Sequence, residues 1–236
     1  MIKKINLLST IKTAISCLVV GIALTSCMGD DDIKNTPQTP MAAMSVFHAS
    51  PDAPGLDIYL DDQKINSNAF KYLQGSGYAY FASGNRRLTL KSTGTATVLL
   101  DTTVSLITNS YYSLFFVDKA AKLKAMLVKD DTEPATGTNA KIRLINLSPD
   151  APAFTVSKNT DTTPLVSADG FRQVTEFREL ASGAYSFTIR DAQTSESLTL
   201  VTTKKIEAGT YYTLITRGYV DAGSTTPFGV EFIVNQ

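Results

Sequence analysis

Residues 48–60 read HASPDAPGLDIYL, and the rest of the chain is best interpreted starting from this stretch. Its element Ser-Pro-Asp-Ala-Pro (50–54) recurs at 148–152. Two further matches follow in the same order: Ala-Ser-Gly at 82–84 and 181–183, and a Tyr-Tyr pair at 111–112 and 211–212. Because the offset grows by one residue at each match, we expect two copies of one unit that differ by single-residue insertions.

Each copy consists of short stretches that are typical of β-strands. In residues 56–60 the apolar side chains alternate, which places Leu56, Ile58 and Leu60 on one face. Gly, Asn and Asp separate further strand-like runs, at 44–49, 87–90, 97–100, 111–117 and 123–128 in the first copy and at 142–147, 185–189, 198–201, 211–215 and 230–234 in the second. This regular spacing predicts an all-β fold of two tandem immunoglobulin-like antiparallel β-sandwich domains, at 42–130 and 139–236, with a linker at 131–138.

The first copy also resembles a known family. Residues 48–60, together with the Gly84 turn before a Leu-Thr-Leu strand, are similar to the pattern of the 4397 family of domains of unknown function. The resemblance covers about residues 44–130. The second copy departs from the motif: Asn146 replaces His48, and Thr155 and Ser157 replace Asp57 and Tyr59. The family occurs on exported and surface proteins and has no defined activity, so the resemblance implies none.

The first 27 residues indicate export and lipid attachment. Lysines at the start precede an apolar run at 14–24, which at about 1.5 Å per residue cannot cross a hydrocarbon core of about 30 Å. The ending Leu-Thr-Ser-Cys resembles the lipobox of bacterial lipoproteins, which implies cleavage before Cys27 and acyl chains on that residue. We therefore expect a signal peptide at 1–26. A plain secretory signal with an incidental cysteine is the alternative.

Residues 27–41 are expected to form the lipidated cysteine and an acidic flexible tether. Asp30-Asp31-Asp32 follows the anchor, and a polar stretch containing Pro and Thr comes next. The acidic triplet resembles the export signals of surface-exposed lipoproteins, and a solvated linker explains the same residues. The expected location is the bacterial outer membrane, with the protein exposed on the cell surface or otherwise facing the periplasm.

The composition excludes several function classes. The chain has 22 Lys and Arg against 22 Asp and Glu, so it lacks the basic surplus of nucleic-acid binders. One His and two Cys are too few for a zinc site or a disulfide framework. The patterns of calcium loops, nucleotide loops and nucleophile elbows are missing from the sequence. We expect no metal, no cofactor and no catalytic residue.

The Ser-Pro-Asp-Ala-Pro element is the strongest motif, and a structural turn explains its residue types. Proline fixes φ near about −65°, and we expect Asp52 to accept a hydrogen bond from the backbone amide two residues on. His48 and its counterpart Asn146 each offer a donor and an acceptor, with which we expect them to close the turn. A cation or ligand at Asp52 or Asp150 is the alternative. The turn-structuring residues are His48, Ser50, Pro51, Asp52 and Pro54 in the first copy and Asn146, Ser148, Pro149, Asp150 and Pro152 in the second.

Three tyrosines around Gly75-Ser76-Gly77 form a candidate binding patch: Tyr72, Tyr78 and Tyr80. Exposed rings beside a glycine-rich loop could stack on sugars or anchor a protein partner, and core packing is the alternative. In the second copy Phe177 stands at the position of Tyr78, which favours burial. Glu179 stands at the position of Tyr80, which favours exposure.

Together these features predict a non-enzymatic, membrane-anchored lipoprotein that serves as an adhesion, assembly or scaffold module of the cell envelope. The alternative is a surface lipoprotein that captures glycans for nutrient uptake. The expected partners are the membrane, through the lipid anchor, and an envelope protein or glycan that the sequence does not identify.

Overall fold

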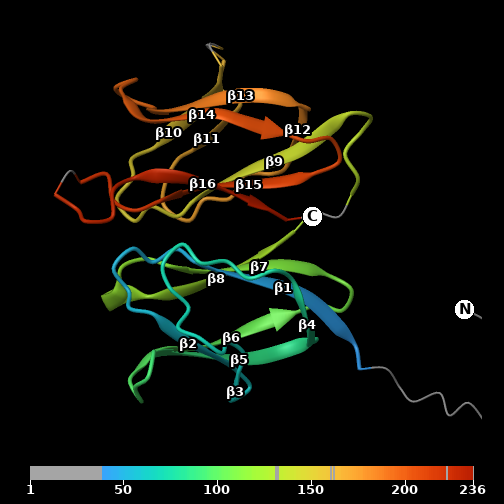
Figure 1. The fold of residues 1–236 in the computed structure, drawn as a ribbon, viewed down its shortest axis with the longest axis vertical. Coiled ribbons are helices and arrows are strands. Elements are labelled where there is room, and N and C mark those ends of the chain that lie inside the picture. The colour runs from blue at the N-terminus through green and yellow to red at the C-terminus, as the bar shows by residue number, and fades with distance from the viewer. Residues whose placement is uncertain (1–38, 131–132, 160, 162, 222, 236) are drawn as a thin grey trace, which may run out of the picture. The chain divides into compact units, whose positions relative to one another are not determined.

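Sixteen strands in four sheets make up the described part of the chain (Figure 1). The computed structural model describes residues 39–130, 133–159, 161, 163–221 and 223–235. The predicted signal peptide, Cys27 and most of the tether lie outside these residues. Among the residues described, no helix is long and apolar enough to cross a membrane.

Each repeat contributes eight strands, and each strand of the first has a counterpart in the second. The first repeat comprises β1 (Met41–His48), β2 (Leu56–Leu60), β3 (Gln63–Lys64), β4 (Ala79–Ala82), β5 (Gly84–Ser92), β6 (Val98–Leu106), β7 (Tyr111–Val117) and β8 (Lys124–Lys129), with a 3-10 turn at Ala120–Lys122. The second comprises β9 (Asn139–Asn146), β10 (Phe154–Lys158), β11 (Val166–Ala168), β12 (Arg178–Ala181), β13 (Gly183–Asp191), β14 (Ser197–Ile206), β15 (Tyr211–Arg217) and β16 (Gly229–Val234).

Two four-stranded sheets face each other in each repeat. The inner sheets have the orders β4-β1-β7-β8 and β12-β9-β15-β16, and the outer sheets have the orders β3-β2-β5-β6 and β11-β10-β13-β14. The prediction of an all-β fold with two tandem sandwiches is therefore confirmed. The short edge strands, among them β4 and β12, were not predicted because they hold too few residues to show a pattern.

One pairing in each inner sheet differs from the antiparallel prediction. β1 runs parallel to β7, with Ser45 opposite Ser113, and β9 runs parallel to β15, with Arg143 opposite Thr213. The turn after β1 sends the chain into the outer sheet, so β7 joins β1 only after crossing back and no hairpin connects the two. Alternation in the sequence does not reveal this, because it is the same for both strand directions.

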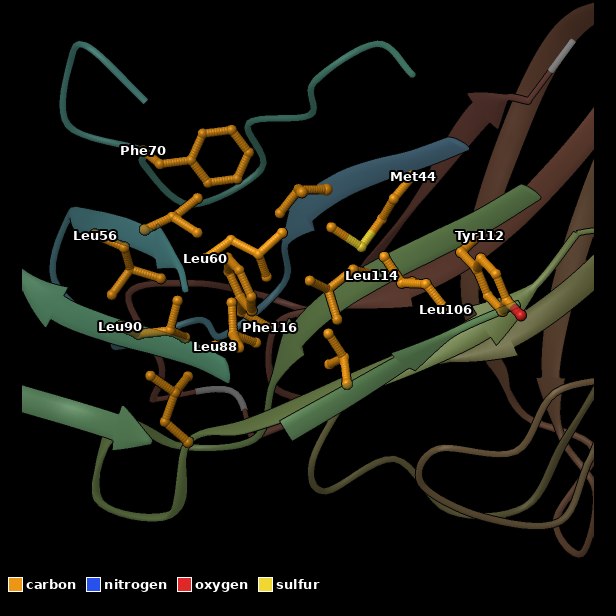
Figure 2. Packing of buried hydrophobic residues seen from close by; sticks show 14 of the residues in the cluster. Met44, Leu56, Leu60, Phe70, Leu88, Leu90, Leu106, Tyr112, Leu114 and Phe116 are labelled. Carbon is orange, nitrogen blue, oxygen red and sulfur yellow. The ribbon is translucent and has the colours of Figure 1, made fainter. Parts of the chain in front are cut away.

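Alternating apolar side chains fill the space between the two sheets of each repeat. Leu56, Ile58 and Leu60 all point into the first core, as their spacing predicts. Figure 2 shows this core, with Phe70 reaching in from the loop after β3 and Phe116 from β7. The second core is built in the same way from β9, β10, β13 and β15, with Phe154 and Phe187 at its centre.

A third apolar cluster lies between the two repeats. Phe115, Val117 and Val128 of the first inner sheet pack with Ile145 and Ile215 of the second. The central strands β7 and β15 are therefore buried on both faces, which explains why they read as nearly continuous apolar runs. Residues 39–236 form one compact unit as a result.

Candidate functional site

The Ser-Pro-Asp-Ala-Pro turn is hydrogen-bonded to the loop that follows β7 in the first repeat and β15 in the second. In the first repeat the Ser50 hydroxyl donates to the carbonyl oxygen of Asp118 at 2.5 Å. The Asp52 carboxylate accepts from the amide of Ala120 at 2.8 Å. The turn between β1 and β2 is thus tied to the end of β7, about 68 residues further along the chain.

The second repeat uses the same residues for the same contacts. Ser148 donates to the carbonyl oxygen of Gly218 at 2.8 Å, and Asp150 accepts from the amide of Val220 at 3.0 Å. Two matching sets of tertiary hydrogen bonds account for the serine and the aspartate of the motif. Among the described residues, no group of His, Cys, Asp or Glu is arranged to hold a metal ion.

The expected local hydrogen bond of Asp52 does not form, and that prediction was wrong. The residue two positions on is Pro54, which has no amide hydrogen to donate. The carboxylate therefore turns to the free amide of the loop after β7. Pro51 and Pro149 lie in the turns themselves, and Pro54 and Pro152 lie in the extended segments before β2 and β10.

His48 and Asn146 are fully buried behind the turns and bind different parts of them. The His48 Nε2 donates to the carbonyl oxygen of Pro54 at 3.2 Å, and its ring stacks on Phe70. Burial lowers the pKa of His48, so the ring is neutral at pH 7. Asn146 Oδ1 instead accepts from the amide of Ser148 at 3.1 Å. His48 therefore binds the last residue of its turn motif, Pro54, whereas Asn146 binds the first residue of its motif, Ser148.

The three tyrosines of the predicted patch have different surroundings. Tyr80 on β4 is 67% exposed. Tyr78 is half-buried, packs edge-on against Tyr111 and donates its hydroxyl to Asp130 at 2.6 Å. Tyr72 is also half-buried beside the His48 ring, and burial raises the pKa of Tyr72 to about 12. The structure therefore leaves only Tyr80 available as a stacking surface among the three.

A buried ion pair that the sequence patterns did not predict joins the two repeats. The guanidinium of Arg143 on β9 pairs with the carboxylate of Asp130, which follows β8, and both side chains are almost completely enclosed. Arg143 also donates to the carbonyl oxygen of Lys129 at 3.1 Å and to the Thr213 hydroxyl at 2.9 Å. Its planar face lies 4.6 Å from the centre of the Phe177 ring. The signal in the sequence was an arginine between the apolar residues Ile142 and Leu144 of a predicted strand.

Further hydrogen bonds extend this ion pair into a network. Asp130 accepts from the hydroxyl of Ser113 at 3.0 Å as well as from Tyr78. Asn235 of the second repeat donates to Ser113 at 3.1 Å and to Tyr78 at 3.2 Å, and it accepts from Thr213 at 2.6 Å. Each buried polar group therefore meets a partner from the opposite repeat or from its own, as a low-dielectric site requires.

The network uses equivalent positions of the two repeats. Four pairs of equivalent residues take part: Ser45 and Arg143, Ser113 and Thr213, Asp130 and Asn235, and Tyr78 and Phe177. The network has two halves related by the approximate two-fold symmetry, and only one of them is charged. The charged half contains Asp130 of the first repeat and Arg143 of the second. The other half contains their neutral counterparts, Asn235 of the second repeat and Ser45 of the first. The contact is thus a nearly two-fold arrangement in which a single ion pair breaks the symmetry.

Two of the hollows in the described part of the chain bear on a binding role. One, of about 330 Å³, lies beside Gly75, Ser76 and Gly77 and is walled by Phe115 and Phe232. The other, of about 440 Å³, lies on the outer sheet of the second repeat and is lined mainly by polar side chains. The glycine-rich loop therefore borders an apolar hollow at the contact between the repeats rather than an exposed aromatic patch.

These features define a protein with tandem β-sandwiches whose two repeats are joined by a buried ion pair. Residues 42–157 match the family described as Domain of unknown function (DUF4397). The resemblance carried by residues 48–60 is thereby confirmed. The match covers the first repeat and continues through β9 into β10.

Comparison with other known proteins adds only distant likenesses. No curated protein matches the chain in sequence. A carbohydrate-binding module of family CBM26 from Eubacterium rectale Amy13K, solved with maltoheptaose, is 12% identical with a TM-score of 0.28, over 80% of this chain and 96% of that one. A streptococcal virulence factor that binds alpha-glucan is 11% identical with a TM-score of 0.25, over 78% and 95%. Likenesses this weak carry no argument about function.

Proposed function

We propose that the protein is a non-enzymatic lipoprotein of the cell envelope that acts as a rigid adhesion, assembly or scaffold module. The observation that carries this proposal is the buried pair of Arg143 and Asp130 between the repeats. An enclosed ion pair offsets its desolvation cost only in one well-defined geometry, so it favours a single arrangement of the two sandwiches. Such a unit holds its outer faces at a constant spacing, which suits a module that positions partners.

The single histidine supports a role without catalysis. His48 is enclosed, its Nε2 is committed to a backbone carbonyl, and its ring packs between Phe70 and Tyr72. A general base must reach the proton that it abstracts from a substrate, and this ring does not reach the surface.

Anchoring through Cys27 is the second part of the proposal. The lipobox-like ending of the signal segment and the acidic stretch after it support a lipid anchor and a tether at the outer membrane. Two or more acyl chains give stable membrane attachment where one chain is marginal. The tether would then hold the paired sandwiches away from the bilayer, on the cell surface or in the periplasm.

Fractionation and crosslinking of intact cells test the two parts separately. We expect the wild-type protein in the membrane fraction and the variant Cys27→Ser in the soluble fraction. Retention of the variant in the membrane would contradict the anchor. Crosslinking followed by affinity capture should recover a reproducible set of envelope proteins with the wild type. The scaffold role is wrong if that set is unchanged in the variant Arg143→Ser, which leaves the buried carboxylate of Asp130 unpaired and so weakens the contact between the repeats.

Glycan capture is the second candidate function, and one observation favours it. The hollow on the outer sheet of the second repeat is lined by side chains that bind hydroxyl groups well. A glycan array probed with the full chain distinguishes the candidates, since a lack of any binding would count against capture and leave the scaffold role standing.

A further inference from the structure

The outer sheet of the second repeat presents a polar face around the 440 Å³ hollow. Alternate residues of β10 and β13 fill the core, so Thr155, Ser157, Thr188 and Arg190 lie on the opposite face of the sheet, where Ser157 is the most enclosed with 8% of its surface exposed. The antiparallel register brings Ser157 opposite Thr188 and Thr155 opposite Arg190. All four line the hollow. Its volume lies within the range of about 300–1,000 Å³ that is typical of small-ligand sites.

Comparison of the repeats shows why the hollow is there. In the first repeat, Tyr59 occupies the position of Ser157, and Lys91 occupies that of Arg190. The ammonium of Lys91 lies 4.6 Å from the centre of the Tyr59 ring, so the two side chains cover this part of the sheet. The second repeat replaces the ring by a small hydroxyl group. The space that the aromatic ring covers in one repeat is therefore open in the other.

The side chains around the hollow have unused hydrogen-bonding capacity. Within the described part of the chain, the hydroxyls of Thr155, Ser157 and Thr188 make no hydrogen bond to another residue. Each hydroxyl can donate one hydrogen bond and accept others. Three such groups on one concave face match a ligand that is itself rich in hydroxyl groups.

Arg190 adds a positive charge that forms no ion pair with an acid of the described residues, although Asp161 and Asp191 line the same hollow. The one side-chain hydrogen bond of Arg190 among the described residues goes to the carbonyl oxygen of Ser195, at 3.3 Å. The two carboxylates at the rim have other partners. Asp161 pairs with Lys158 at 2.5 Å, and Asp191 accepts from two backbone amides that lower the pKa of Asp191. The guanidinium therefore keeps donors in its planar fork that suit a carboxylate of a ligand.

We propose that this hollow binds an acidic saccharide, with the sugar hydroxyls on Thr155, Ser157 and Thr188 and the carboxylate on Arg190. The inference deepens the second candidate function by naming the class of glycan. It does not depend on the lipid anchor or on the scaffold role. A neutral sugar would satisfy the hydroxyl groups and leave the guanidinium unused, so the acidic group decides the specificity.

Calorimetric titration of the full-length protein in detergent tests the proposal. The probes are oligosaccharides of uronic acids and sialylated oligosaccharides, each compared with its uncharged counterpart. We expect at least one acidic probe to bind about tenfold or more tightly than its counterpart, as one charge-assisted hydrogen bond provides. Binding of neutral probes with equal affinity would support glycan capture and overturn the acidic specificity. No binding by any probe would overturn the site itself.

Three variants locate the binding in the hollow. Ser157→Tyr introduces the ring of the first repeat and should abolish binding. Arg190→Gln should weaken binding of the acidic probe about tenfold and leave the thermal midpoint unchanged, which keeps the test valid if the tyrosine variant folds poorly. Lys91→Gln is the matched control on the first repeat and should have no effect. The proposal is overturned if Arg190→Gln binds as the wild type does, or if Lys91→Gln loses as much affinity.

Discussion

Arg143 of the second repeat and Asp130 of the first form an ion pair between the two sandwiches, where only 2% and 1% of their side-chain surfaces are exposed. Buried charges of this kind are costly unless each meets its partner and the remaining hydrogen bonds are made. Here Thr213, Ser113 and Tyr78 supply those bonds. The stability of the contact between the repeats should therefore depend on both charges together.

A double-mutant cycle tests this dependence. Arg143→Ser alone leaves a buried carboxylate unpaired, and Asp130→Asn alone leaves a buried guanidinium unpaired. We expect each to lower the free energy of unfolding by about 3–5 kcal/mol. The double variant removes both charges and should lose clearly less than the sum, measured by urea unfolding. Additive losses would show that the two charges act independently.

The stability of the protein should fall in mild acid because of His48. Burial lowers the pKa of His48 in the folded state, whereas the unfolded chain has an ordinary histidine pKa of about 6.5. As the pH falls below about 6.5, the unfolded state therefore binds a proton at His48 before the folded state does. The contribution of the buried neutral His48 to folding stability is fully present above this pH and is lost below it. Unfolding at pH 7.5 and 5.5 measures the effect, and the variant His48→Asn should show less of it.

The side chain at position 48 should matter for its hydrogen bond more than for its ring. Asn146 shows that an asparagine can close the equivalent turn through the amide two residues on. We expect His48→Asn to keep the thermal midpoint near that of the wild type and His48→Ala to lower it, because alanine leaves buried polar groups of the turn without a partner. Equal losses in the two variants would contradict this role.

The clamps formed by the repeated aspartates should each contribute to stability. Asp52→Ala removes one hydrogen bond to a backbone amide of the loop after β7, and Asp150→Ala removes two to amides of the loop after β15. Both carboxylates lie at the surface, so we expect each loss to be about 1 kcal/mol. Chemical unfolding of the two variants measures it. A loss in one repeat only would mean that the motif has different roles in the two copies.

Gly218 should not tolerate a side chain. Its φ is +74°, and a Cβ there would lie 2.3 Å from the carbonyl oxygen of Pro227. We expect Gly218→Ala to lower the free energy of unfolding by about 2 kcal/mol or more. Gly137→Ala is the matched control, because that glycine also has a positive φ but nothing near its Cβ position. Similar losses in both variants would assign the effect to φ alone.

The repeat and the faces of the strands could be predicted, since both follow from local spacing. Leu56, Ile58 and Leu60 point into the core because side chains alternate along any strand, whatever it pairs with. The exposure of Tyr80 agrees with a charged residue, Glu179, at the equivalent position. Comparison of the two copies thus supplied information that a single copy would lack.

The contacts that define the sites could not be predicted, because their partners lie far away in the sequence. Asp52 meets Ala120 only after β1 and β7 have paired in parallel, and alternation does not reveal strand direction. Arg143 meets Asp130 only after two inner sheets have packed together. The hollow beside Ser157 depends on what the neighbouring strand carries, so it became visible only when the register was known.

Because the anion lies in the first repeat and the cation in the second, the two repeats also present chemically different surfaces to each other. Two first repeats brought together in the same way would enclose a pair of carboxylates with serines and no cation. Two second repeats would enclose a pair of guanidinium groups with asparagines and no anion. Only unlike halves satisfy each other, and the short linker keeps the correct partner at high effective concentration. Where many copies crowd together, the charges therefore disfavour this kind of contact between like repeats of neighbouring chains.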